Sequence, residues 1–167
     1  LPILRYGEQV LRHPAIPVAD ITPDVEQLID NMVQTMYAAP GIGLAATQIG
    51  VQLRIFVADV SGGHKQEDLV VFVNPQLVEV GGAQYEDEGC LSVPGFNATV
   101  ARPMRAVVKG LTRDGHEQLL EGTGLLARCL QHEMDHLDGT LFVDRLRGLQ
   151  KTLIVRKIKK LSRLGKW

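Results

Sequence analysis

The segment His132-Glu133-Met134-Asp135-His136 combines residue types and a spacing that can bind and use a metal ion. Two histidines four residues apart lie one turn apart on a helix, so both imidazoles can reach a single ion. Glu133 between them can take a proton from a water on that ion. Two surface histidines on an amphipathic helix are the alternative, and the neighbouring leucine stripe makes it the weaker one. We therefore predict a metal site with His132 and His136 as ligands.

A catalytic metal site has three protein ligands and one open position, so a third ligand has to be found. No Glu follows Glu133, which excludes a site with a downstream Glu ligand. Phe142 stands where the metzincin protease motif would place its third histidine. Asp138 and Asp144 are the only carboxylates downstream of the motif, and they remain weak candidates.

Two cysteines are the other candidates for the third ligand. Cys129 shares the helix face of His132, but its Cα would lie about 10.5 Å from that of His136, beyond the combined reach of the two side chains. We interpret Cys129 as a small apolar residue that lines the site. An isolated cysteine such as Cys90 is more often a buried structural residue. The helix lacks a ligand, however, and Cys90 is the residue that remains. A thiolate with two imidazoles suits zinc and ferrous iron equally.

Apolar residues at helical spacing predict three helices around this site. The metal motif lies in the second, which begins at about Gly124 and ends at the C-cap signal Gly139. The first helix spans about residues 23–39. The third, amphipathic and basic, spans about residues 147–162.

Short apolar runs separated by Gly, Asn and Pro fill the middle of the chain. Their lengths and their Val and Phe content predict strands at about residues 53–60, 69–73, 77–80, 98–101, 106–111 and 118–120. Arg113-Asp114-Gly115 is a hairpin turn signal between the last two runs. Helices that flank a block of antiparallel strands are typical of the α+β class.

The chain of 167 residues is 45% apolar and has no linker-like segment, so we predict one domain over residues 1–167. A net charge of −1 gives no reason to expect a nucleic-acid binder. The apolar stretches are too short to cross a membrane, and the presence of only two cysteines favours a reducing compartment. We therefore expect a protein of a bacterial-type cytoplasm. We also expect it to act as a monomer. Because the first residue is Leu1, a removed leader and an organellar origin stay open.

Three separate segments resemble the motifs of the peptide deformylase family: residues 41–48 (GIGLAATQ), 88–92 (EGCLS) and 131–136 (QHEMDH). Their order and spacing are also similar to the family's, and weaker similarity runs from Ile3 to about Arg145. The resemblance implies an α+β fold in which largely antiparallel sheets enclose the HExxH helix. It also implies N-formyl-methionyl nascent peptides as substrate and ferrous iron as the usual metal, with zinc or nickel able to substitute.

The resemblance also assigns roles to residues. It implies that Cys90, His132 and His136 are the metal ligands and that Glu133 is the general base and acid. A water on the ion has a lowered pKa, and Glu133 can take its proton as it attacks the formyl carbon. Glu133 can then return the proton to the departing amine, and formate is released.

The resemblance further implies that the Gln48 side chain and the Leu91 backbone N–H stabilise the negative charge that develops on the formyl oxygen. The residues alone would favour a structural role for Gln48, as a polar residue that closes an Ala- and Gly-rich strand. Four residues suit an apolar pocket of methionine size: Ile42, Gly43, Leu125 and Cys129. Gly41, Gly43 and Gly89 would let a peptide lie close to the main chain and add as a strand, although each could equally be a turn glycine.

The C-terminal segment has a charge of its own. Residues 145–167 carry nine of the 18 Lys and Arg and none of the 19 Asp and Glu. A solvated face on a packed helix is one interpretation. Contact with RNA is the other, because the resemblance implies ribosome docking through a C-terminal helix.

Two other functions remain open at this point. An endopeptidase with an HExxH helix would cleave internal peptide bonds and tolerate Cys90→Ser, whereas a deformylase would release formate and lose activity with that change. A non-catalytic module stabilised by a metal would keep its function after Glu133→Ala.

Glu88 and Arg102 are a candidate ion pair behind Cys90, of the kind that supports metal ligands.

Overall fold

The computed structural model describes residues 1–167. Its helices and strands follow in the order α1 (Pro23–Ala38), β1 (Gly43–Ala45), β2 (Ile55–Ala58), β3 (Val70–Gly81), β4 (Gln84–Gly89), β5 (Asn97–Arg102), β6 (Arg105–Leu111), β7 (Glu117–Thr123), α2 (Gly124–Leu137) and α3 (Leu149–Arg163). Five strands form an antiparallel sheet in the order β1-β2-β3-β6-β7, and β4 pairs with β5 in a second sheet. The α+β class predicted from the sequence is confirmed.

The two faces of the larger sheet bury different side chains, because successive residues of a strand point to opposite faces. Phe56 of β2 and Phe72 of β3 lie in the same apolar cluster as residues of α2. Ile55 and Val57, their neighbours on β2, lie in the cluster that contains α1. The strand β2 is therefore buried on both faces, between two helices.

The start of α1 follows from local chemistry. Thr22 has an extended backbone, and its Oγ1 accepts a hydrogen bond from the Val25 N–H at 3.3 Å. Pro23 occupies the first turn, where a missing N–H costs nothing. The predicted helix is confirmed, with its end one residue earlier than residue 39.

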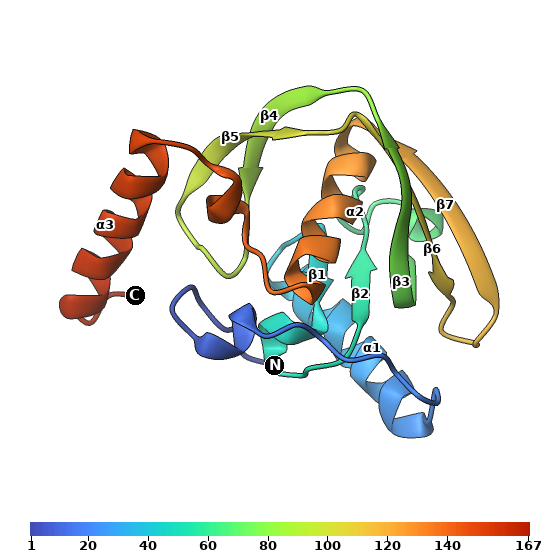
Figure 1. The fold of residues 1–167 in the computed structure, drawn as a ribbon. Helices are drawn as coiled ribbons and strands as arrows, with labels where there is room; N and C mark the ends of the chain where they lie inside the picture. The colour runs from blue at the N-terminus through green and yellow to red at the C-terminus, as the bar shows by residue number, and fades with distance from the viewer.

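The helix α2 lies between the five-stranded sheet and the β4–β5 hairpin (Figure 1). Every residue from Ala127 to Leu137 is buried, including the charged ones. The prediction that sheets enclose a central HExxH helix is therefore confirmed. Its position matters for the site, since the polar residues of α2 from Arg128 to His136 are largely withdrawn from bulk water.

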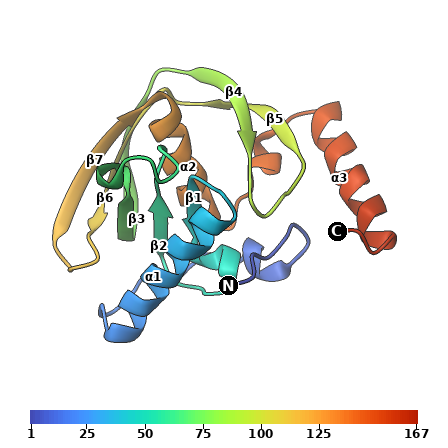
Figure 2. The same cartoon turned by 180° about the vertical axis from the view of Figure 1, so that it is seen from behind.

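The helix α3 packs at the other end of the molecule from β7, as both views show (Figures 1 and 2). Its buried residues, Ile154 and Ile158, join an apolar cluster with β5 and the segment after α2. Beyond the helix, the Trp167 Nε1–H donates to the Tyr6 carbonyl at 2.8 Å, which ties the C-terminal residues to the N-terminal segment. No helix in the structure combines the length and the low polarity that crossing a bilayer requires.

Three strands differ from the sequence prediction. No strand was predicted at β4, which contains the charged residues Glu86, Asp87 and Glu88, although it pairs along its whole length with β5. The short strand β1 was not predicted either. The runs at 69–73 and 77–80 belong to one strand, β3, which continues past Pro75 because the pairing with β6 shifts register there.

We expect Phe56→Ala to lower the free energy of unfolding by about 3–5 kcal/mol, because it leaves a cavity between β2 and α2. Phe56 is fully buried and lies 5.3 Å from the ring of Phe72, centroid to centroid. Chemical denaturation measures the change. Leu119→Ala is the control, since Leu119 is 69% exposed and should change stability by less than about 0.5 kcal/mol. Equal losses for the two variants would contradict this account of the core.

Candidate metal centre and active site

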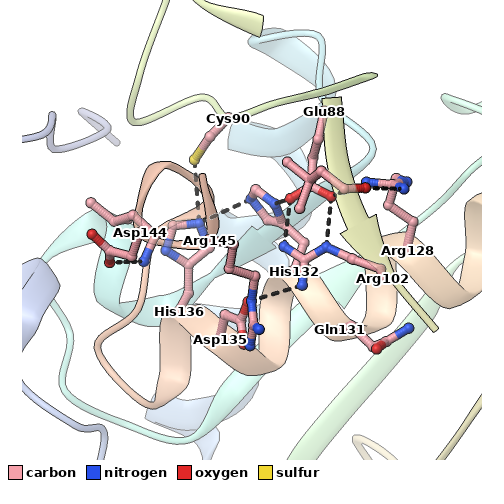
Figure 3. Close-up of polar contacts among 12 residues, drawn as sticks. Glu88, Cys90, Arg102, Arg128, Gln131, His132, Asp135, His136, Asp144 and Arg145 are labelled. Carbon is pink, nitrogen blue, oxygen red and sulfur yellow. Dashed lines mark hydrogen bonds and ion pairs between the residues drawn. The ribbon is translucent and has the colours of Figure 1, made fainter. Parts of the chain in front are cut away.

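The fold brings together three side chains that the sequence placed in two distant segments (Figure 3). Cys90 directly follows β4, and His132 and His136 lie one turn apart on α2. The Cys90 Sγ lies 3.3 Å from the His136 Nε2, which lies 3.1 Å from the His132 Nε2. The three ligand atoms all lie within 4.8 Å of one another. Such convergence is what coordination of one ion requires.

The tautomer of His132 can be argued from its partner. Its Nδ1 lies 2.6 Å from a carboxylate oxygen of Glu88, and an ionised carboxylate can only accept a hydrogen bond. Nδ1 therefore carries a proton, and in the neutral ring the Nε2 lone pair faces the other two members of the cluster. Metal-binding histidines usually have this arrangement. The donor set of one thiolate and two imidazoles fits a divalent ion such as zinc or ferrous iron.

The two carboxylates that the sequence left as weak candidates lie elsewhere. The Asp138 side chain is 61% exposed and pairs with Arg54 at 2.9 Å. Asp144 accepts from the Leu141 N–H at 2.9 Å and forms an ion pair with Arg12. Neither belongs to the cluster of ligand atoms.

Cys129 lies beside the site without joining the ligand cluster. Its S–H donates to the Ile42 carbonyl at 3.4 Å. Burial, together with the nearby Glu133, raises the pKa of the Cys129 thiol well above its ordinary value, so this side chain stays neutral. The interpretation of Cys129 as an apolar lining residue agrees with this geometry.

Glu133 lies in a tight, buried space. Its Oε1 is buried without a hydrogen-bond partner, and burial raises the pKa of its carboxyl to about 7. A group with such a pKa can both accept and return a proton near neutral pH. A Cβ on Gly43 would lie 2.4 Å from the Glu133 Oε2 and 3.0 Å from the Cys129 Sγ. Gly43 therefore makes the space in which this carboxylate sits.

Gln48 and Leu91 both lie next to Cys90, Gln48 in space and Leu91 along the chain. The Gln48 Oε1 accepts from the Ala45 N–H at 2.9 Å, while its Nε2 donates to the Ser92 Oγ at 3.0 Å and lies 3.7 Å from the Cys90 Sγ. The Leu91 N–H makes no hydrogen bond within the chain. Both groups are thus donors beside the ligand cluster, and the Gln48 amide is held rigidly by its partners.

A cavity of about 760 Å³ opens beside the ligand cluster. The predicted pocket residues all line it: Ile42, Gly43, Gly89, Leu125 and Cys129. Sequence reasoning missed further lining residues, among them Arg5, Asp87, Phe96, Asn97 and Arg128. Arg128 could have been found, since it lies one helical turn before His132. The others come from segments whose approach to the cavity has no local sequence signal.

Glu88 is the centre of a buried charged group behind His132 (Figure 3). Its carboxylate accepts two hydrogen bonds from Arg102, at 2.7 and 2.5 Å, and one from Arg128 at 2.7 Å. Burial alone would raise the pKa of Glu88. The hydrogen bonds from Arg102 and His132 outweigh it and hold that pKa well below its usual range. The predicted pair of Glu88 and Arg102 is present.

Comparison with known proteins agrees with these observations. The family model described as polypeptide deformylase matches residues 1–152. The chain belongs to this family. A peptide deformylase of Thermodesulfovibrio yellowstonii is 46% identical over 159 residues, which are 95% of this chain and 96% of that relative. Membership of the deformylase family agrees with the metal-dependent hydrolysis that the HExxH motif indicated. It also excludes the alternative that the protein is an HExxH endopeptidase.

Solved structures of deformylases have the same fold. One from Legionella pneumophila has a TM-score of 0.91 and 46% identity, and the match covers 98% of this chain and 96% of that one. Another, from Synechococcus elongatus in complex with actinonin, has a TM-score of 0.90 and 40% identity over 97% of this chain and 88% of that one. The chain is thus a metal-dependent deformylase, an enzyme that removes the N-formyl group from nascent peptides.

We expect Gly43→Ala to reduce deformylase activity by about 100-fold, because the new methyl group would displace the Glu133 carboxylate by roughly 1 Å. The rate of formate release measures the effect. Gly81→Ala is the matched control: a Cβ on Gly81 would meet nothing within 4 Å, and its φ is not in the left-handed region. Unchanged activity in Gly43→Ala would show that Glu133 is not confined as described.

Proposed function

We propose that Cys90, His132 and His136 hold one divalent cation and that Glu133, Gln48 and Leu91 carry out deformylation around it. The observation that supports this most directly is the convergence of one sulfur and two ring nitrogens within 4.8 Å, beside a buried carboxylate. Glu133 lies on the same helix as both histidines, so its distance to the site is fixed by the helix itself.

In this proposal Glu133 moves the proton. When bound, the cation lowers the pKa of a water and polarises the formyl carbonyl. Glu133 takes a proton from the attacking water and later gives it to the departing amine, so its carboxyl ends each cycle in its starting state. Its raised pKa, about 7, keeps both transfers close to balance.

Two fixed donors serve the formyl oxygen. The Leu91 N–H has no other partner, and the Gln48 amide is held beside Cys90 by Ala45 and Ser92. Donors that are already in place need no rearrangement as negative charge develops, and each contributes about 3 kcal/mol to lowering the barrier in comparable sites.

The cavity supplies selectivity, because a formyl group is too small to be recognised alone. We propose that Ile42, Leu125 and Cys129 receive the methionine side chain, with Gly43 and Gly89 next to the peptide backbone. Gly89 ends β4, so a substrate there could add to the strand through main-chain hydrogen bonds. Arg128 also lines the cavity, and its three guanidinium nitrogens are all used within the protein.

We propose ferrous iron as the native metal, with zinc and nickel as substitutes. The thiolate and imidazole donor set suits iron and zinc equally. The choice of iron is supported by its being the usual metal of the family. The proposal extends to one catalytic domain over residues 1–167, acting as a monomer in the cytoplasm.

Formate release from formyl-Met-Ala-Ser tests the proposed function, with the iron form prepared anaerobically and compared with zinc and nickel forms. We expect Glu133→Gln to lose about 100- to 10,000-fold in rate while it still binds the metal. Cys90→Ser should lose the metal, and Cys129→Ser, the matched control, should keep it. Absence of formate from every metal form of the unchanged protein would refute the proposal.

We also propose that the exposed basic face of α3 contacts ribosomal RNA. Arg156 and Lys160 are exposed on this helix, and neither forms an ion pair within the chain. Reversal of both charges should weaken cosedimentation with ribosomes about tenfold and reduce its salt dependence. The control reverses Lys65 and Lys109, which are exposed and also unpaired. Equal binding by the two double variants would leave α3 as a solvated helix.

A further inference from the structure

A chain of charged side chains connects a metal ligand to the surface (Figure 3). It begins at His132, whose Nδ1 lies 2.6 Å from Glu88. Glu88 accepts from Arg102, and the Arg102 Nη1 donates to Asp135 at 2.9 Å. Asp135 in turn accepts two hydrogen bonds from Arg145, from Nε at 2.5 Å and from Nη2 at 2.6 Å.

Arg102 links Glu88 to Asp135 in this series of contacts, and each of its three guanidinium nitrogens donates to a carboxylate. Its Nε and Nη2 face Glu88, while its Nη1 faces Asp135. A planar guanidinium held by carboxylates on two edges cannot rotate away from either one. Only 2% of the Arg102 side chain is exposed, so water cannot replace a lost partner.

Arg145 is the member of this chain that reaches solvent. Its side chain is 45% exposed, against 13% for Asp135 and 2% for Arg102. It ends the short 3₁₀ helix Phe142–Arg145, just beyond α2. Asp135 has no side-chain hydrogen bond other than those from Arg102 and Arg145. Arg145 thus supplies two of the three donors to a carboxylate on the metal-binding helix.

We propose that Arg145 is a positioning residue for the metal site, acting through Asp135, Arg102 and Glu88 on the ring of His132. The inference rests on the proposed roles of His132, His136 and Cys90 as ligands. Arg145 touches neither the ligands nor the cavity. Its two hydrogen bonds occupy both oxygens of the Asp135 carboxylate, so that the Arg102 guanidinium stays directed at Glu88.

Removal of Arg145 leaves Asp135 with Arg102 as its only charged donor. Asp135 then competes with Glu88 for that guanidinium, and the Glu88 carboxylate is held less firmly against His132. Loss of a group that directly supports a metal ligand weakens metal binding by about 10- to 100-fold. Arg145 lies further along the chain of contacts, so we expect a smaller effect of about fivefold.

The test measures metal retention rather than turnover. The Co²⁺ form of Arg145→Ala should release its metal to EDTA about fivefold faster than the unchanged protein, and its visible absorption bands should shift. Arg147→Ala is the matched control, because it removes the same charge two residues away. The Arg147 side chain is exposed and makes no hydrogen bond or ion pair, unlike that of Arg145. Identical release rates and spectra for Arg145→Ala and the unchanged protein would overturn the proposal.

A double variant separates positioning from general destabilisation. If Arg145 acts through Asp135, the variant with Arg145→Ala and Asp135→Asn should release Co²⁺ no faster than Asp135→Asn alone. Fully additive effects would also overturn the proposal. Arg145→Lys keeps the charge but loses the two-point contact with Asp135, so its rate of Co²⁺ release should fall between those of Arg145→Ala and the unchanged protein. It provides a second, folded variant should Arg145→Ala be unstable. These rates do not depend on formate release, so failure here leaves the proposed function standing.

Discussion

The hydrogen bonds to the buried carboxylate of Glu88 are the interactions on which the candidate metal site depends. The carboxylate receives hydrogen bonds from Arg102 on β5, from Arg128 on α2 and from the ring of His132. A charge removed from water in this way is stable only when every oxygen is satisfied by partners with good geometry. Three elements must therefore meet with little freedom at this point. The same meeting fixes the tautomer of His132 and places Cys90, two residues after Glu88, next to α2.

The larger sheet prepares this meeting from the opposite side of α2. Phe56 and Phe72 pack against the apolar side of the helix, so its polar residues face the β4–β5 hairpin and the cavity. Close packing leaves little room for error where Gly43 approaches Glu133. A buried carboxylate beside a buried cluster of candidate ligands is thus a consequence of enclosing one amphipathic helix between two sheets.

The candidate metal site could be predicted from the sequence only in part. The spacing of His132 and His136 is local, and helix geometry turns it directly into a pair of candidate ligands. Cys90 could be reached by exclusion and by resemblance, but its meeting with the helix depends on β4, a strand whose charged sequence gives no strand signal. The partners of Asp135 were not predictable, because Arg102 is 33 residues away and its placement depends on β5 pairing with β4.

The C-terminal helix shows how one segment can have two roles. Ile154 and Ile158 pack in an apolar cluster that also touches Cys90, so the buried side of α3 supports the neighbourhood of Cys90. The deformylase family model matches residues 1–152, so its last matched residue lies near the start of this helix. Five of the six basic residues of α3 follow that point, and all five are exposed. Packing constrains the inner face of α3, whereas its outer face can change charge without disturbing the metal site, which leaves that face open to recognition of a partner.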